Sequence, residues 1–150
     1  MKLAEALQER ADIQKRLAQL KGRLRNNARV QEGEQPSEKP EELLRELEML
    51  IARLEDLVTR INKTNAETVD AEESLTALLA RRDCLRTKVV MLRDFLDEAS
   101  DLSNRALRSE IKIKSTVSVV EKRKELDTLA QELRRLDTRI QQRNWLTELL

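Results

Sequence analysis

The sequence predicts an all-α protein, an antiparallel bundle or coiled coil of about four long helices within a single domain of residues 1–150. Residues 41–150 contain neither glycine nor proline, the residues that break helices most strongly. Charged residues make up 38% of the chain and apolar residues 39%, and this balance, with Leu, Ala, Glu, Lys and Arg dominant, is typical of long helices. Phe95 and Trp145 are the only aromatics, so the core must be aliphatic, which suits narrow seams between helices.

The first predicted helix spans residues 2–31 and is followed by a polar loop at residues 32–39, where Gly33 and Pro36 break the helical pattern. Its apolar residues form one narrow stripe, which Arg10 interrupts. The members of the stripe include Leu3, Ile13, Leu17, Leu20 and Leu24. A helix with so narrow a stripe is marginal alone, and the loop favours an antiparallel hairpin with the next helix.

The second predicted helix, residues 40–65, has the widest apolar face of the chain. One row recurs in steps of four and three: Leu43, Leu47, Leu50, Leu54, Leu57 and Ile61. A second row, Leu44, Ile51 and Val58, recurs in steps of seven. Together the rows can pack against two neighbours at once, which predicts a bundle of at least three helices. We expect self-association to complete this face, as a dimer or a higher symmetric oligomer.

The apolar period lapses around residues 66–71, where we predict a loop. Asp70 and Glu73 have the spacing of a capping box, with Asp in place of the usual Ser or Thr, and would begin a third helix at residues 72–107. The alternative is one continuous helix over residues 41–108, roughly 100 Å long. We favour the break because Asn, Thr and Asp crowd this interval and the hydrophobic register does not continue across it.

Residues 109–117 alternate isoleucine with lysine and continue with β-branched residues, which is the pattern of a short strand. Such a strand would be an open edge that could pair with another subunit or with a protein partner. The alternative is an irregular connection between helices. A fourth helix is predicted at residues 118–148, with a stripe formed by Val119, Leu126, Leu129, Leu133, Leu136 and Ile140.

The composition excludes several classes of chemistry. A formal net charge of +1 offers no electrostatic footprint for nucleic acid. Because the chain has no histidine and one cysteine, Cys84, we expect no catalytic pair, metal centre or cofactor, and a partly buried helical position for that thiol. No apolar run approaches the roughly 20 residues that span a bilayer, and the N-terminus has no signal-peptide core. We therefore expect a cytoplasmic protein that is not an enzyme and has no membrane span.

The remaining candidates for a site are polar residues on or beside the apolar stripes. They are Asn62, Thr64, Asn65, Arg82, Asp83, Arg86, Asp137, Arg139, Asn144 and Trp145. One interpretation is a hydrogen-bonded network that fixes register and oligomer state. Another is a small anion or ligand pocket, with Arg82 and Arg86 as charge partners and Trp145 as a lid. In the third, these residues are exposed helix ends.

Three segments carry a resemblance to a known family: INKTN at residues 61–65, LLARRDCLR at residues 78–86 and LDTRIQQRNWLTELL at residues 136–150. Nearly the whole chain resembles a family of uncharacterised small bacterial proteins, mainly actinobacterial, some of which carry the label septicolysin. The resemblance implies a helical, self-associating protein of unknown function and brings no catalytic residues. Family members often have an aromatic in the strand-like stretch, where this chain has SEIKIKST.

We therefore expect a structural or scaffolding protein that acts through helix-mediated self-association and protein interaction. The alternative that the family label suggests is a membrane-active, cytolysin-like protein, although the chain has neither the Trp-rich undecapeptide nor the length of the β-rich toxins behind that label. A helical bundle that binds a small ligand through its polar insertions is the further alternative.

Overall fold

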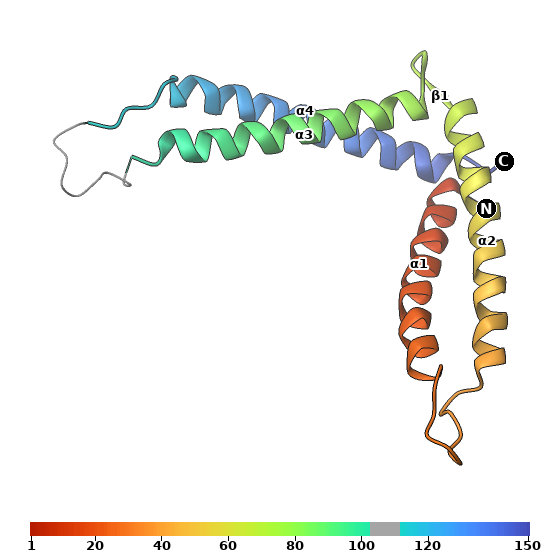
Figure 1. Ribbon diagram of the computed structural model, residues 1–150. Helices are drawn as coiled ribbons and strands as arrows, with labels where there is room; N and C mark the ends of the chain where they lie inside the picture. Colours follow the sequence, from red (N-terminus) through yellow and green to blue (C-terminus); the bar gives the residue numbers. More distant parts are fainter. Residues whose placement is uncertain (103–111) are drawn as a thin grey trace. The chain divides into compact units, whose positions relative to one another are not determined.

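The computed structural model of the protein describes residues 1–102 and 112–150. Its elements in chain order are α1 (Leu3–Asn26), α2 (Pro40–Glu67), β1 (Val69–Asp70), β2 (Glu73–Ser74), α3 (Leu75–Ser100) and α4 (Val119–Leu146) (Figure 1). The predicted all-α class with four helices is confirmed, and a small antiparallel sheet is added to it. The chain forms two compact units, Met1–Ser74 with Arg143–Leu150, and Leu75–Gln142.

The first unit is built on an antiparallel hairpin of α1 and α2, which run side by side in Figure 1. The buried apolar residues of the two helices are Leu3, Ala6, Ile13, Leu20, Leu43, Leu50, Leu57 and Ile61. The first predicted row of α2 is thus the row that enters the core. The second row lies at the edge, because one neighbouring helix covers only one strip of a helix surface. Leu44 stays 49% exposed and Ile51 45% exposed.

Helix α1 ends at Asn26, five residues before the predicted end. The next residue, Asn27, is buried and joins the helix end to the loop. Its Nδ2 donates a hydrogen bond to the carbonyl oxygen of Arg23 at 2.8 Å, and its Oδ1 accepts one from the backbone N–H of Glu38 at 2.9 Å. The side chain therefore competes for backbone groups that a longer helix would have needed.

The predicted break after the second helix is present, which excludes the continuous helix. The interval holds a tight hairpin in which Val69 pairs with Ser74 and Asp70 with Glu73. Ala71 and Glu72, at its tip, have positive φ angles of 48° and 71°. Two consecutive positive φ angles are typical of the two-residue turns that match the twist of paired strands. The expected loop is thus a small sheet, and α3 begins at Leu75.

The second unit is a pair of antiparallel helices, α3 and α4 (Figure 1). Ion pairs join Arg82 to Asp137 near one end and Asp97 to Arg123 near the other. Val89, Leu96 and Leu126 are buried between the helices, with Leu85, Leu92, Val117, Leu129 and Leu133 packed around them. Leucine spacing predicted both stripes. None of the helices, as far as the structure describes them, is both long and apolar enough to cross a membrane.

The predicted strand at residues 109–117 falls partly outside the described residues, which exclude 103–111. Residues 112–117 form no strand, so in this part the irregular connection is the observed form. Within the described part of the chain, residues 112–117 have no strand beside them to pair with, and backbone pairing is what stabilises a strand. Helix α3 ends at Ser100 rather than at 107, and residues 103–107 of that prediction also lie outside the described residues.

Candidate functional site

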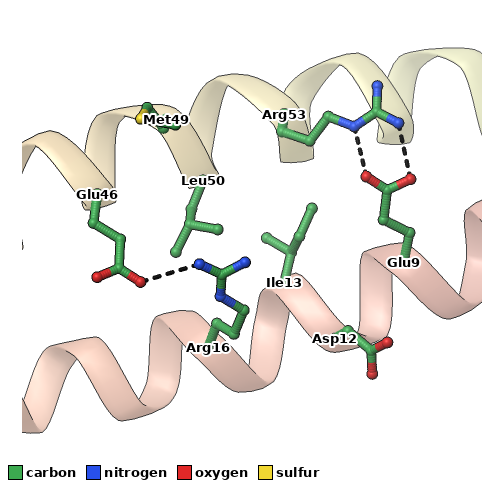
Figure 2. A pocket seen from close by; sticks show the side chains of 8 residues that line it. All are labelled: Glu9, Asp12, Ile13, Arg16, Glu46, Met49, Leu50 and Arg53. Atoms are coloured by element: carbon green, nitrogen blue, oxygen red, sulfur yellow. Dashed lines mark hydrogen bonds and ion pairs between the residues drawn. The ribbon is translucent and has the colours of Figure 1, made fainter.

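A groove of about 280 Å³ runs along one side of the α1–α2 hairpin (Figure 2). Its floor is apolar, because Ile13 of α1 and Leu50 of α2 are buried there, and exposed Met49 borders them. Its rims carry charged side chains from both helices: Glu9, Asp12, Arg16, Glu46 and Arg53. The groove is therefore an apolar trough between two charged edges.

Ion pairs cross this groove and neutralise most of its rim charges (Figure 2). Arg53 binds Glu9 with two hydrogen bonds, from Nε to Oε1 at 2.7 Å and from Nη2 to Oε2 at 2.8 Å. Arg16 donates from Nη2 to Oε1 of Glu46 at 3.2 Å. The hydrogen bonds from Arg53 lower the pKa of the Glu9 carboxyl below its ordinary value. Such two-pronged pairs fix geometry as well as charge, so they set the register of the hairpin.

A third set of contacts closes the loop end of the same side. Arg23 donates from Nη2 to Oε1 of Glu38 at 2.6 Å and from Nε to Oε2 at 3.1 Å, and from Nη1 to Oε2 of Glu46 at 3.3 Å. The guanidinium lowers the pKa of the Glu38 carboxyl. Within the described residues, no group of three or more His, Cys, Asp and Glu could hold a metal ion. The groove side of the hairpin thus has most of its charges paired internally over an apolar floor.

The opposite side of the hairpin, which we call the open face, differs from the groove side. Successive residues of a helix point about 100° apart. Met49, one residue before the core residue Leu50, lines the groove. Ile51, one residue after Leu50, therefore points to the opposite side of the hairpin. The open face of α2 consists of Leu44, Ile51 and Val58, flanked by Glu41, Glu48 and Glu55 at the same seven-residue spacing. The open face of α1 consists of Leu7, Arg10, Gln14, Leu17, Lys21 and Arg25. On the open face as a whole, the half-exposed Leu44 and Ile51 of α2 lie between the charged residues of α1 and those of α2.

The predicted polar residues divide equally between the two units. Asn62, Thr64, Asn65, Asn144 and Trp145 belong to the first. Thr64 is fully buried: its Oγ1 donates to the carbonyl oxygen of Arg60 at 2.8 Å and accepts from the N–H of Leu150 at 3.0 Å. Asn144 is also buried, Asn65 is half-buried, and Asn62 and Trp145 are exposed. Thr64 therefore holds the C-terminal residue against α2.

The second unit brings four of the predicted residues into one chain of ion pairs. Arg82 donates to Oδ1 of Asp83 from Nε at 3.0 Å and from Nη2 at 2.8 Å. Arg82 and Arg86 lie 3.8 Å and 3.6 Å from Oδ1 of Asp137. The fifth residue, Arg139, lines a cavity of about 190 Å³ with Arg81, Glu132, Arg135 and Leu136. Trp145 belongs to the first unit, so its role as a lid over these arginines stays a prediction.

Helix α3 also carries apolar side chains on its outer surface. Met91 is 67% exposed and Phe95 is 45% exposed, and both line a shallow hollow with Leu92 and Cys84. Cys84 is exposed, which corrects the expectation of a partly buried position. The reason is its register: Leu85 and Val89 pack in the α3–α4 core, and Cys84, one residue before Leu85, lies about 100° away from it around the helix. This surface of α3 thus carries exposed apolar side chains, as the open face of the hairpin does.

Sequence reasoning missed the contacts that tie the chain ends into the first unit. The backbone N–H of Leu3 donates to the carbonyl oxygen of Thr147 at 2.9 Å, and that of Leu149 donates to Met1 at 2.9 Å. Arg143 donates from Nε to Oδ1 of buried Asp70 at 2.7 Å. Two signals were available: the apolar residues Leu146, Leu149 and Leu150, which indicate that this segment is packed, and Arg143, a charged residue where the stripe of α4 calls for a hydrophobe. Its partner could not be inferred, because 73 residues separate the two.

The comparisons with known proteins agree with this fold and name no activity. The family described as a "Family of unknown function (DUF6847)" matches residues 10–149. The chain belongs to this family. A crystal structure described as "a functionally unknown conserved protein from Corynebacterium diphtheriae" is 44% identical, covers 100% of this chain and 99% of that chain, and has a TM-score of 0.95. A search of the curated proteins finds no match. The resemblance to a family of unknown function is therefore confirmed, whereas neither description contains the septicolysin label.

Proposed function

We propose that this member of the DUF6847 family is a cytoplasmic helical scaffold that acts by self-association and not by catalysis. One observation carries the proposal. Two large aliphatic side chains of α2, Leu44 and Ile51, remain about half exposed on the same helix face, beside the buried leucines of the hairpin. Apolar surface that one chain leaves in water is stabilised when another protein surface covers it.

The outer surface of α3 supports the same proposal independently. Met91 and Phe95 are exposed one helical turn apart, and Phe95 is one of only two aromatic residues in the chain. The ion pairs between α1 and α2 also fix which residues of the two helices lie side by side. A hairpin of fixed register with an uncovered apolar edge is suited to assembly.

Sedimentation velocity across a wide range of protein concentration tests this proposal. A self-associating scaffold gives a sedimentation coefficient that rises with concentration to the value of a defined oligomer. A coefficient that stays at the monomer value throughout would overturn the proposal. The membrane-active role implied by the septicolysin label predicts instead that the monomer releases dye from liposomes. Dye release by a protein that stays monomeric would therefore support the membrane-active role over the scaffold.

A further inference from the structure

The open face of the hairpin separates its charges by helix. Every charged residue that α1 places on this face is basic: Arg10, Lys21 and Arg25. Every charged residue that α2 places there is acidic: Glu41, Glu48 and Glu55. The face is therefore positive along one helix and negative along the other, with the half-exposed Leu44 and Ile51 between the charges.

These charges differ from those of the groove side in lacking partners. On the groove side, three arginines reach across the hairpin to acidic residues. On the open face, none of the six charged residues makes an ion pair within the described chain. Arg10 is the clearest case, because its Nε is buried and has no hydrogen-bond partner among the described residues. That buried N–H is costly and out of reach of another chain, but Arg10 as a whole is only half-buried, so the terminal N–H groups of its guanidinium can take a charged acceptor from a second copy.

The ion pairs of the groove fix which residues of α1 and α2 lie at the same level. Glu9 is paired with Arg53, and the two helices are antiparallel, so the next residue of α1, Arg10, lies level with the preceding residue of α2, Ala52. Along the helix axis this level falls between Glu48 and Glu55. Because Arg16 is paired with Glu46, Lys21 lies level with Glu41.

Two copies can pack open face to open face in two symmetric ways, and the charges distinguish them. In the first, the two-fold axis is perpendicular to the helices, so α1 lies on α1 and α2 on α2, which brings like charges together. In the second, the axis is parallel to the helices, so each residue keeps its level along them and α1 of one copy lies on α2 of the other. Arg10 then covers the partner's Ile51 with its aliphatic stem, and its guanidinium extends between the partner's Glu48 and Glu55. Lys21 likewise meets the partner's Glu41.

We propose that the open face is the interface of a two-fold homodimer in which α1 of each copy packs antiparallel on α2 of the other, with Arg10 bound between Glu48 and Glu55 of the partner subunit. This inference rests on the proposed function and adds the surface, the partner and its orientation. Each dimer contains the Arg10 contact twice, because a two-fold interface is self-complementary.

Charge reversal with mixing tests the inference. Arg10→Glu alone places like charges at both copies of the contact, and so does Glu48→Arg combined with Glu55→Arg. Each variant alone should therefore raise the dimer dissociation constant by roughly ten- to a hundred-fold, since like charges across an interface are strongly unfavourable. Mixed in equal amounts, the two variants restore opposite charges at both contacts. The mixture should regain the wild-type dimer mass, measured by sedimentation equilibrium.

The mixture guards against misinterpreting a folding defect, because a misfolded variant could not form the heterodimer. Lys15→Glu is the matched control, since Lys15 is an exposed basic residue of α1 that lies outside the open face, and it should leave the dissociation constant unchanged. A wild-type protein that dimerises while Arg10→Glu dimerises equally well would overturn this interface and leave the scaffold proposal intact. Two variants that both dissociate but do not recombine would also overturn it. A monomeric wild-type protein would overturn both proposals.

Discussion

Replacing the two half-exposed residues of the open face by glutamine should dissociate the protein. Leu44→Gln combined with Ile51→Gln removes the apolar centre of the interface. Glutamine is a good helix former and keeps the length of the side chain, so α2 should form in the variant. The change is thus directed at intermolecular burial rather than at the hairpin itself.

The expected magnitude follows from the exposure of the two residues. Fully burying a leucine or isoleucine side chain contributes about 1.5–3 kcal/mol relative to full exposure. Leu44 is 49% exposed and Ile51 45% exposed, so about half of that, roughly 1 kcal/mol each, is still available to dimerisation. Two side chains on each of two copies give about 4 kcal/mol, which corresponds to a rise in the dissociation constant of about 1,000-fold.

Sedimentation equilibrium measures this dissociation constant directly. Met49→Gln provides a matched control on the same helix: Met49 is 73% exposed but borders the groove, so its substitution should leave the constant unchanged. Circular dichroism should show the same helix content in all three proteins. A double variant that dimerises as tightly as the wild-type protein would refute the assignment of the open face, whatever its stability.

Three further predictions concern other parts of the chain. Arg143→Met should lower the free energy of unfolding, measured by urea titration, by about 1–2 kcal/mol, because it removes a partner from the buried carboxylate of Asp70. The loss is limited because Arg143 itself is partly exposed. Equal stability of variant and wild type would show that the pair contributes nothing. Cys84 should react with a thiol reagent in the native protein as fast as a free thiol, because its side chain is exposed on α3; a reaction that becomes fast only after denaturation would contradict this. Glu9→Gln should cost a small amount of stability at neutral pH and none in strong acid. Arg53 holds the folded-state pKa of Glu9 below its unfolded-state value, so the stabilisation is present above the unfolded-state pKa and is lost as pH falls through the folded-state pKa; a cost that persists in acid would contradict this.

The helices were predictable because their apolar spacing follows from helix geometry alone. Leu43, Leu50 and Leu57 recur at seven-residue intervals, and the structure buries all three. Helix ends were less predictable, since they depend on particular contacts. Asn27 ends α1 by binding backbone groups on both sides of the loop. Asparagine is a common residue at helix ends, so it was the available signal, but its partner at Glu38 depends on the path of the loop.

The small sheet could not be predicted from the residues that form it. Ala71 and Glu72 adopt positive φ angles. Glycine and asparagine are the residues that indicate such angles in a sequence, and neither is present at this turn. The candidate site was predictable only in part for a different reason. Periodicity identified the two rows of α2, whereas the pairing of Glu9 with Arg53 and of Asp70 with Arg143 joins residues 44 and 73 positions apart. Such partners depend on the tertiary fold and not on local pattern.

Light scattering during size-exclusion chromatography measures the mass of the wild-type protein in solution and so shows whether the chain self-associates. We expect a dimer with twice the 17.5 kDa of one chain, about 35 kDa, at concentrations above the dissociation constant. A mass of 17.5 kDa that does not change with concentration would show that the protein is a monomer and overturn the proposed dimer.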